Sequence, residues 1–89
     1  MKVIANYREE IDSIDRELIA LFEKRMDMAR LVAEYKKEND MEIFHQARER
    51  EVINKCLEDL DNKEYEQYVI EFMKKVMDLS KKFQFNLIK

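Results

Sequence analysis

Residues 4–36 read IANYREEIDSIDRELIALFEKRMDMARLVAEYK, and this stretch decides the fold. Its apolar residues recur at alternating steps of three and four, which is the pattern of a helix with one seam against other helices. The spacing predicts one long helix, roughly Ile4 to Lys36. The apolar members of the seam are Ile4, Tyr7, Ile11, Ile14, Leu18, Leu21, Met28, Val32 and Tyr35.

Two cations lie on the face that this pattern assigns to the interior. Arg25 stands where the series calls for an apolar residue, and Lys36 follows eleven residues later. Eleven residues at about 100° each return to nearly the same face, about 16 Å farther along the axis. A buried cation without a partner is costly by several kcal/mol. Either carboxylates of the chain or an anionic ligand must therefore face both side chains.

The composition indicates a single all-α domain over residues 1–89. The chain has neither glycine nor proline, which favours helices joined by short polar connections. The net charge is −3 and no basic face is evident, so we expect no nucleic-acid partner. No apolar run approaches the ~18 residues of a membrane span, and no secretory signal is visible. We therefore expect a cytoplasmic protein with no membrane partner.

The single cysteine, Cys56, can form neither an intrachain disulfide nor a cysteine-based zinc site.

The rest of the chain predicts two further helices, one short and one of medium length. Asn39-Asp40 ends the long helix, because both side chains compete for backbone hydrogen bonds. The second helix runs from about His45 to Asp59, and the third from about Lys63 to Phe85. Asp61 and Glu64 have the spacing of a capping box at the start of the third helix.

The long helix is too large for the remaining residues to cover. A helix of about 33 residues is about 50 Å long. Small, elongated domains bury only a modest fraction of their surface. We therefore expect a helical homodimer whose long helices pack on each other.

Polar residues also interrupt the apolar faces of the two shorter helices. Ser80 and Gln84 continue the stripe of the third helix one turn apart, so both can reach the same object. Taken alone, they fit better a stripe that has reached an exposed helix end. Arg48 and Glu49 open the second helix and, taken alone, fit a solvated charge pair. Together with the two cations of the long helix, these four side chains predict a site for a small anion with more than one carboxylate.

A longer motif connects these residues. It reads Arg8-x-x-Ile11-Asp12-x-Ile14-Asp15-x-x-Leu18-x-x-Leu21-x-x-x-Arg25, followed by Lys36, Arg48-Glu49, Ser80 and Gln84. The motif covers nearly the whole chain and closely resembles that of the all-helical chorismate mutases. The resemblance implies three helices per chain and an intertwined homodimer with two equivalent sites. It also implies rearrangement of chorismate to prephenate, on the route to phenylalanine and tyrosine, without a cofactor or a metal.

The resemblance implies that arginines hold the carboxylates of the substrate. Arg25 and Arg48 match two such family arginines, and Arg8 matches one that reaches across from the partner subunit. The spacing supports the role of Arg8 independently, because seventeen residues separate it from Arg25. That separation is about 25 Å along one helix, which is more than a small ligand spans. An antiparallel partner helix brings its own Arg8 back toward this Arg25.

The remaining roles concern the ether oxygen and the ring of the substrate. Lys36 and Gln84 match the groups at the ether oxygen, and Lys36 also contacts a carboxylate. Glu49 matches the carboxylate on the ring hydroxyl, and Ser80 a hydroxyl near the ring carboxylate. His45 stands where many relatives have Asp, in a contact made partly through the backbone, so substrate affinity is the property this departure affects.

Two alternatives remain. A lyase of the same fold splits isochorismate into salicylate and pyruvate at a similar site. Ser80, Gln84 and a loop of ordinary length after Lys36 favour the mutase. A non-catalytic helical dimerisation module predicts instead that carboxylates of the chain neutralise Arg25 and Lys36.

Overall fold

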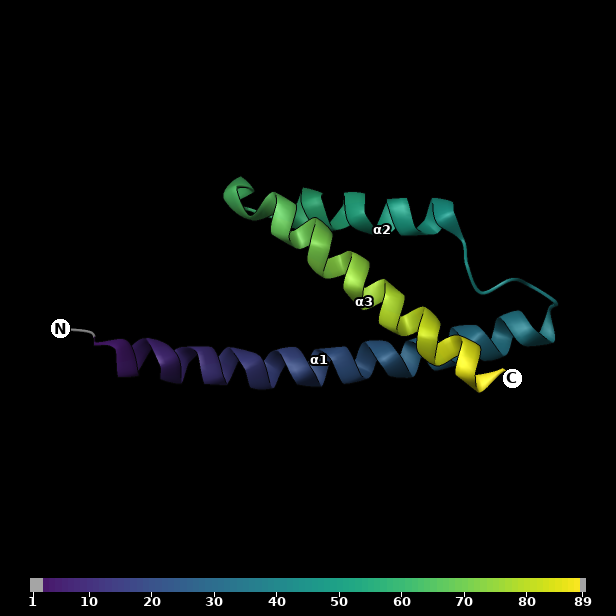
Figure 1. Cartoon of the computed structure of the whole chain (residues 1–89), viewed down its shortest axis with the longest axis horizontal. Helices are drawn as coiled ribbons and strands as arrows, with labels where there is room; N and C mark the ends of the chain where they lie inside the picture. The colour runs from purple at the N-terminus through teal and green to yellow at the C-terminus, as the bar shows by residue number, and fades with distance from the viewer. Residues whose placement is uncertain (1–2, 89) are drawn as a thin grey trace.

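The computed structural model describes residues 3–88, which form three α-helices and one short 3-10 segment (Figure 1). The order is α1 (Ile4–Glu38), α2 (Gln46–Asp59), η1 (Lys63–Tyr65) and α3 (Glu66–Leu87). The prediction of an all-α chain with one long, one short and one medium helix is confirmed. Within residues 3–88, no helix is both long enough and apolar enough to cross a membrane.

Helices α1 and α3 pack on each other through small residues. Ala29 and Ala33 lie one turn apart on α1, and their relative exposures are 7% and 0%. Because neither side chain extends beyond its β-carbon, α3 can approach the backbone of α1 closely. Gln84 Nε2 donates to the carbonyl oxygen of Ala29 at 2.9 Å across this contact. Among residues 3–88, the buried apolar residues are Ala29, Ala33, Ile43, Val76 and Met77.

The connection between α1 and α2 is held in place by hydrogen bonds from the end of α1. The side-chain amide of Asn39 donates to the carbonyl oxygen of Tyr35 at 2.8 Å. Asp40 adopts a left-handed backbone with φ of 55°, which aspartate tolerates better than most residues. Ile43 is buried, and its carbonyl oxygen accepts a hydrogen bond from Lys36 Nζ at 2.9 Å. The connection therefore forms part of a fixed wall next to the end of α1.

The third helix begins with a different cap from the one that the sequence predicts. The capping box on Asp61 is wrong: Asn62 caps the 3-10 segment, and its side-chain oxygen accepts from the Glu64 N–H at 3.0 Å. Asparagine two residues before the donor closes an Asx turn, so it satisfies this N–H in place of Asp61. Lys63 Nζ donates to the carbonyl oxygen of Leu57 at 2.6 Å and so covers the end of α2.

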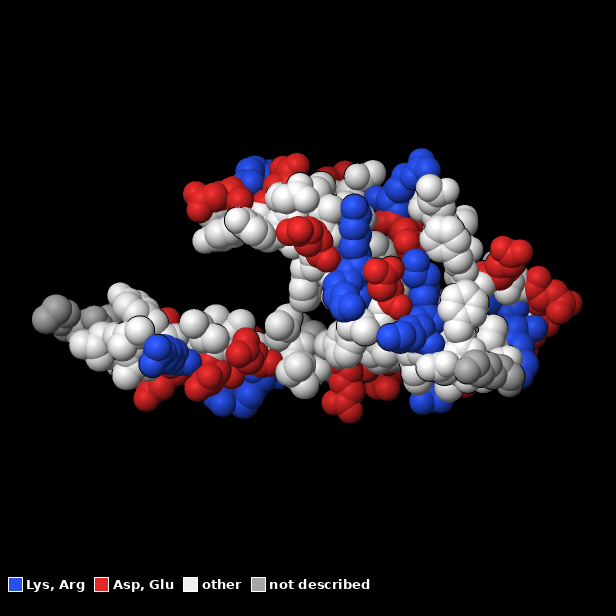
Figure 2. All heavy atoms as spheres, in the orientation of Figure 1, with Lys and Arg blue, Asp and Glu red and all other residues white. Residues whose placement is uncertain are grey.

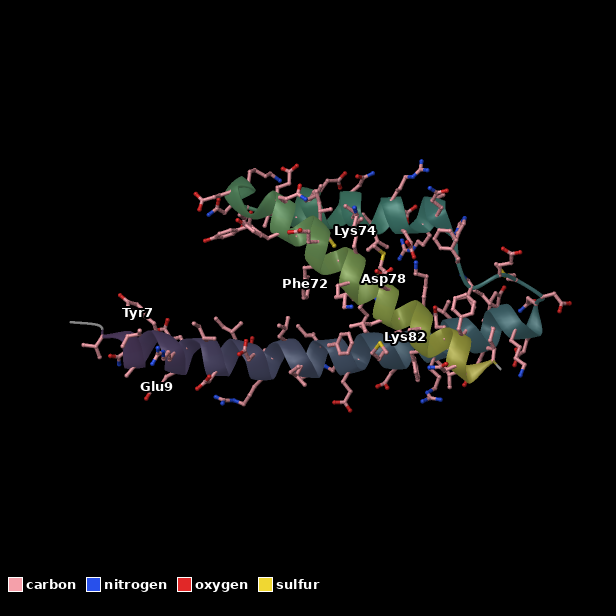
Figure 3. The ribbon with its side chains drawn as sticks, viewed as in Figure 1. Tyr7, Glu9, Phe72, Lys74, Asp78 and Lys82 are labelled. Carbon is pink, nitrogen blue, oxygen red and sulfur yellow. The ribbon has the colours of Figure 1, made fainter. Side chains whose placement is uncertain are left out.

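The N-terminal part of α1 extends beyond both other helices (Figures 1 and 2), and the apolar side chains of its seam are exposed. Ile11, Ile14 and Leu21 keep 53%, 60% and 61% of their surface exposed. Phe72 projects from α3 toward the space above this part of α1 (Figure 3). A contiguous exposed apolar surface of this kind marks an interaction site. The groove beside it is lined by Leu18, Ile19, Leu21, Phe22, Arg25, Phe72, Met73, Lys75, Val76 and Leu79.

Candidate active site

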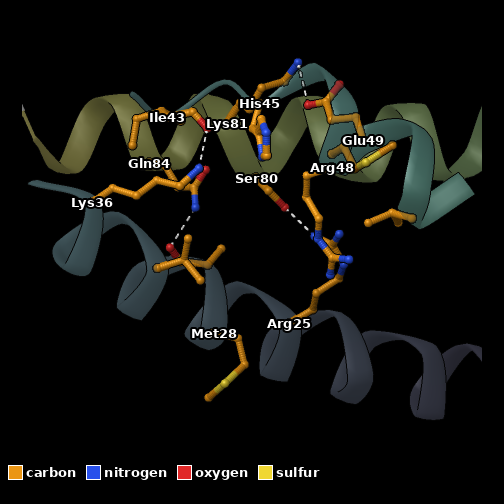
Figure 4. Close-up of a pocket in the computed structure, with 14 residues that line it drawn as sticks. Arg25, Met28, Lys36, Ile43, His45, Arg48, Glu49, Ser80, Lys81 and Gln84 are labelled. Carbon is orange, nitrogen blue, oxygen red and sulfur yellow. Dashed lines mark hydrogen bonds and ion pairs between the residues drawn. The ribbon is translucent and has the colours of Figure 1, made fainter. Parts of the chain in front are cut away.

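A pocket of about 290 Å³ is formed by side chains from all three helices and from the connection between α1 and α2. Figure 2 shows lysine, arginine and carboxylate side chains gathered over this part of the molecule, and Figure 4 shows the pocket in detail. All the residues that the sequence predicts for the site line it, with the exception of Arg8. They are Arg25, Lys36, His45, Arg48, Glu49, Ser80 and Gln84.

Arg8 does not line this pocket. It is exposed near the start of α1, and the helix is continuous from Ile4 to Glu38. Arg8 and Arg25 are therefore about 25 Å apart along one helix, and no bend in the chain brings them closer. The Arg8 of the same chain cannot contribute to this pocket.

Arg25 is oriented by a buried serine of α3. Its Nη1 donates to Ser80 Oγ at 2.7 Å, and Ser80 Oγ itself lies 3.0 Å from the carbonyl oxygen of Val76, to which it donates. Ser80 is only 6% exposed, so its hydroxyl is a fixed acceptor for the guanidinium group. In Figure 4, Arg25 from α1 and Arg48 from α2 project toward the same end of the pocket. Two planar cations so placed suit a ligand with carboxylate groups.

Lys36 and Gln84 provide hydrogen-bond donors at the other end of the pocket (Figure 4). Lys36 Nζ donates to the Ile43 carbonyl oxygen, and Gln84 Nε2 to that of Ala29, both at 2.9 Å. An ammonium group has three N–H donors and a primary amide has two. Each side chain is therefore held by one bond and keeps a further donor for a ligand. Gln84 is 8% exposed, so its donor is well shielded from water.

Arg48 and Glu49 do not pair with each other, which corrects the interpretation of the two as a solvated charge pair. Arg48 instead forms an ion pair with Glu51 on the exposed side of α2. The hydrogen bonds from Arg48 and then Lys55 lower the pKa of Glu51 below its usual value. Glu49 Oε2 lies 3.0 Å from Lys81 Nζ, and both of these side chains are 25% exposed. The structure thus separates neighbours in sequence into two different ion pairs.

Lys81 is a pocket residue that the sequence did not predict. It belongs to a Ser80-Lys81-Lys82 stretch in which charge alone does not distinguish a pocket lysine from a solvated one. A usable signal is its position four residues after Met77 and three before Gln84, which puts it on the pocket face of α3. The sequence likewise did not assign the apolar side chains of the lining. These are Met28, Ala29, Val32, Ile43, Val52 and Met77.

The charges that line the pocket are mainly positive. Among residues 3–88, no carboxylate forms an ion pair with Arg25 or Lys36. The dimerisation-module alternative predicts such carboxylates, so the structure does not favour it. Cations that lack anionic partners inside a partly covered pocket are suited to an anionic ligand.

Comparison with known proteins shows which family the chain belongs to. The T-protein of Haemophilus influenzae is 42% identical to the chain over 52 residues, which are 58% of this chain and 13% of that protein. The chain thus spans only a small part of the length of this relative. No solved structure matches the chain at a significant level. The family described as chorismate mutase type II matches residues 7–85. Because that match extends over nearly the whole chain, the resemblance is confirmed, and this chain belongs to the chorismate mutase type II family, a family of isomerases.

Proposed function

We propose that this chain rearranges chorismate to prephenate in the pocket between its three helices. The observation that carries the assignment is the group of three cations, Arg25, Lys36 and Arg48, on the wall of one small pocket. Chorismate bears two carboxylates, which the two arginines match in charge and geometry. The family supports a role in aromatic amino acid biosynthesis and, with it, a cytoplasmic location.

The proposed catalysis needs no proton transfer. The rearrangement is intramolecular: one C–O bond breaks while one C–C bond forms. The substrate must first fold into a compact, chair-like shape that brings the two reacting carbons together. Arg25 and Arg48 enforce that shape by fixing both carboxylates, which removes rotational freedom before the reaction begins. The hydrogen bond from Arg25 to Ser80 keeps the guanidinium group in position for this task.

Charge stabilisation provides the second part of the proposed mechanism. As the C–O bond opens, negative charge grows on the ether oxygen. The remaining N–H donors of Lys36 and Gln84 face that oxygen and bind it more tightly in the transition state than in the ground state. Both side chains are already held by carbonyl oxygens, so little reorganisation accompanies the reaction.

The remaining side chains bind the ring and its substituents. Glu49 accepts a hydrogen bond from the ring hydroxyl, and Ser80 lies near the ring carboxylate. His45 is the N-cap residue of α2, is exposed and makes no side-chain capping bond. The backbone N–H groups that follow it are free at the helix start, and these provide the contact at this position.

We further propose that the active unit is an intertwined homodimer. The exposed seam of α1 and the apolar groove beside α3 support this assembly, because both are apolar surfaces that a second α1 would bury. In an antiparallel arrangement the partner subunit's Arg8 completes the carboxylate site that Arg25 begins. The length of α1 supports the same arrangement, since the Arg8 of the same chain is too far away.

The lyase alternative is less well supported. Both polar side chains of α3 that favour the mutase, Ser80 and Gln84, are buried and line the pocket. Neither residue lies at an exposed helix end, so the interpretation of the two as the exposed end of an apolar stripe is removed. We therefore propose the mutase reaction alone.

Purified protein incubated with chorismate provides the test. We expect loss of chorismate absorbance and formation of prephenate, identified by chromatography. Lys36→Met should lower the rate by about 10²–10³ without loss of helicity, because it removes a preorganised donor. Lys37→Met is the matched control, since Lys37 is exposed and outside the pocket. Salicylate and pyruvate from isochorismate would support the lyase, and no turnover of either compound would overturn the proposal.

A further inference from the structure

Lys81 is held at one position on the pocket wall by groups from three parts of the chain. Its Nζ lies 3.0 Å from Glu49 Oε2 on α2 and 3.5 Å from Asp78 Oδ1 on α3. It also lies 4.7 Å from the centroid of the Phe44 ring, in the connection between α1 and α2. Figure 4 shows the contact between Lys81 and Glu49, and Figure 3 places Asp78 one turn earlier on α3.

The three contacts are unequal, and the one to Glu49 is the strongest. Asp78 keeps 65% of its side chain exposed, so water screens its attraction for the ammonium group. Glu49 and Lys81 are each only 25% exposed, and their polar atoms are closer. The hydrogen bond that Lys81 donates to Glu49 is also the largest cause of the raised pKa of Lys81. The ring of Phe44 adds a cation–π contact that limits where the ammonium group can move.

Glu49 has a free acceptor while it is bound in this way. The contact to Lys81 uses Oε2, and a carboxylate has a second oxygen with its own lone pairs. Glu49 lines the pocket, so that second oxygen is available to a donor on a bound ligand. A carboxylate tied at one oxygen retains fewer orientations for the other, which reduces the entropy lost on binding.

We propose that Lys81 is a positioning residue that fixes the carboxylate of Glu49 for the ring hydroxyl of the substrate. The inference rests on the proposed function. It assigns to Lys81 an action through Glu49, without contact to the reacting atoms. The ring hydroxyl is unchanged in the reaction, so the contact contributes equally to the ground state and the transition state.

The expected kinetic effect is therefore confined to binding. Lys81→Met keeps the length of the side chain and removes the charge. It should raise KM for chorismate about tenfold and change kcat by less than about twofold. Lys81→Arg should restore most of the affinity, because it restores the charge-assisted bond to Glu49. Lys82→Met is the matched control, since Lys82 is the adjacent lysine, is exposed and does not line the pocket.

A double-mutant cycle with Glu49→Ala tests whether Lys81 acts through Glu49. The double variant should have the same KM as Glu49→Ala alone, because Lys81 has nothing left to position. Multiplied effects would show that Lys81 acts independently, for example by binding a carboxylate itself, and would overturn the inference. An unchanged KM in Lys81→Met would also overturn it. Lys81→Gln, which keeps a polar group, replaces Lys81→Met if circular dichroism shows that the methionine variant is unfolded.

The activity of the wild-type protein distinguishes failure of this inference from failure of the proposed function. If it converts chorismate and the Lys81 variants behave like Lys82→Met, the inference fails while the proposed function stands. If the wild type does not convert chorismate, the proposed function fails and the inference falls with it.

Discussion

Gln84 donates its side-chain amide to the carbonyl oxygen of Ala29 at 2.9 Å, and this bond joins α3 to α1 at the wall of the pocket. The small side chain at position 29 is what allows the amide to reach the backbone, and burial keeps water away from the bond. One N–H of the amide is thereby fixed, which fixes the direction of the other. The donor proposed to face the ether oxygen is thus oriented before the substrate arrives.

The first prediction concerns pH. The wild type should have a flat rate profile around neutrality, because Gln84 does not titrate and the proposed reaction transfers no proton. In Gln84→Glu the new carboxylate must be protonated to donate, and burial raises its pKa. Its rate should therefore be highest in acid and fall by about 10² as pH rises through that pKa. Gln84→Ala is the control and should be slow at every pH. A flat profile for Gln84→Glu would mean that this side chain does not face the ether oxygen.

A second prediction separates stability from binding at Arg25. In Arg25→Leu, Ser80 keeps its bond to the Val76 carbonyl oxygen, so no buried hydroxyl is left unsatisfied. An apolar residue in place of a half-buried cation is often neutral or stabilising. We expect a melting temperature within a few degrees of wild type and a loss of at least about 10² in kcat/KM. Lys24→Leu, at an exposed neighbour, is the control. A sharp fall in melting temperature would identify Arg25 as a structural residue.

The third prediction tests the shared site. Arg8→Ala and Lys36→Met chains should each be inactive alone. After mixing and subunit exchange, half of the dimers are hybrids, and each hybrid has one site with both residues intact. The mixture should therefore recover about a quarter of the wild-type activity. Mixing two preparations of Arg8→Ala should recover none. Proven exchange without recovery would contradict a site built from both chains.

A fourth prediction follows from the ion pair between Arg48 and Glu51. Without substrate, the guanidinium group of Arg48 is bound to Glu51, and a substrate carboxylate must compete for it. The pKa of Glu51 is lowered, so at any pH above the usual pKa of a glutamate its carboxylate is ionised and paired with Arg48. The ion pair is lost only as the pH falls through the lowered pKa. Glu51→Gln should therefore lower KM near neutrality, by less than about fivefold because both side chains are more than half exposed. The difference from wild type should shrink in high salt. Glu58→Gln, at an exposed position of α2 outside the pocket, is the control. A raised KM would show that Glu51 orients Arg48 for the substrate.

The long helix and most of the site could be predicted because the information is local. The three-and-four spacing of α1 defines an inward face, and Arg25 and Lys36 are conspicuous because they break it. Ser80 and Gln84 are conspicuous on α3 for the same reason, and both are buried. Their individual roles in catalysis stay predictions.

The pairing of Glu49 with Lys81 at the pocket edge could not be predicted because it depends on how α2 and α3 lie against each other. Glu49 and Lys81 are far apart in sequence, and no spacing rule within one helix connects them. The partner of Arg48, by contrast, follows the spacing within one helix, because Glu51 lies three residues on along the same face whereas Glu49 points away. The cap at Asn62 was missed because adjacent Asp and Asn residues compete for the same backbone N–H.

If the uncovered part of α1 is the interface of the proposed dimer, the stability and activity of this protein depend on its concentration. In the proposed dimer each folded chain is a ligand for the other, so dilution removes stabilisation and lowers the melting temperature. Turnover per chain then depends on how many chains are present: below the dissociation constant, total activity rises with the square of concentration. A cell that makes little of this protein would therefore obtain less activity from each copy than a cell that makes much of it.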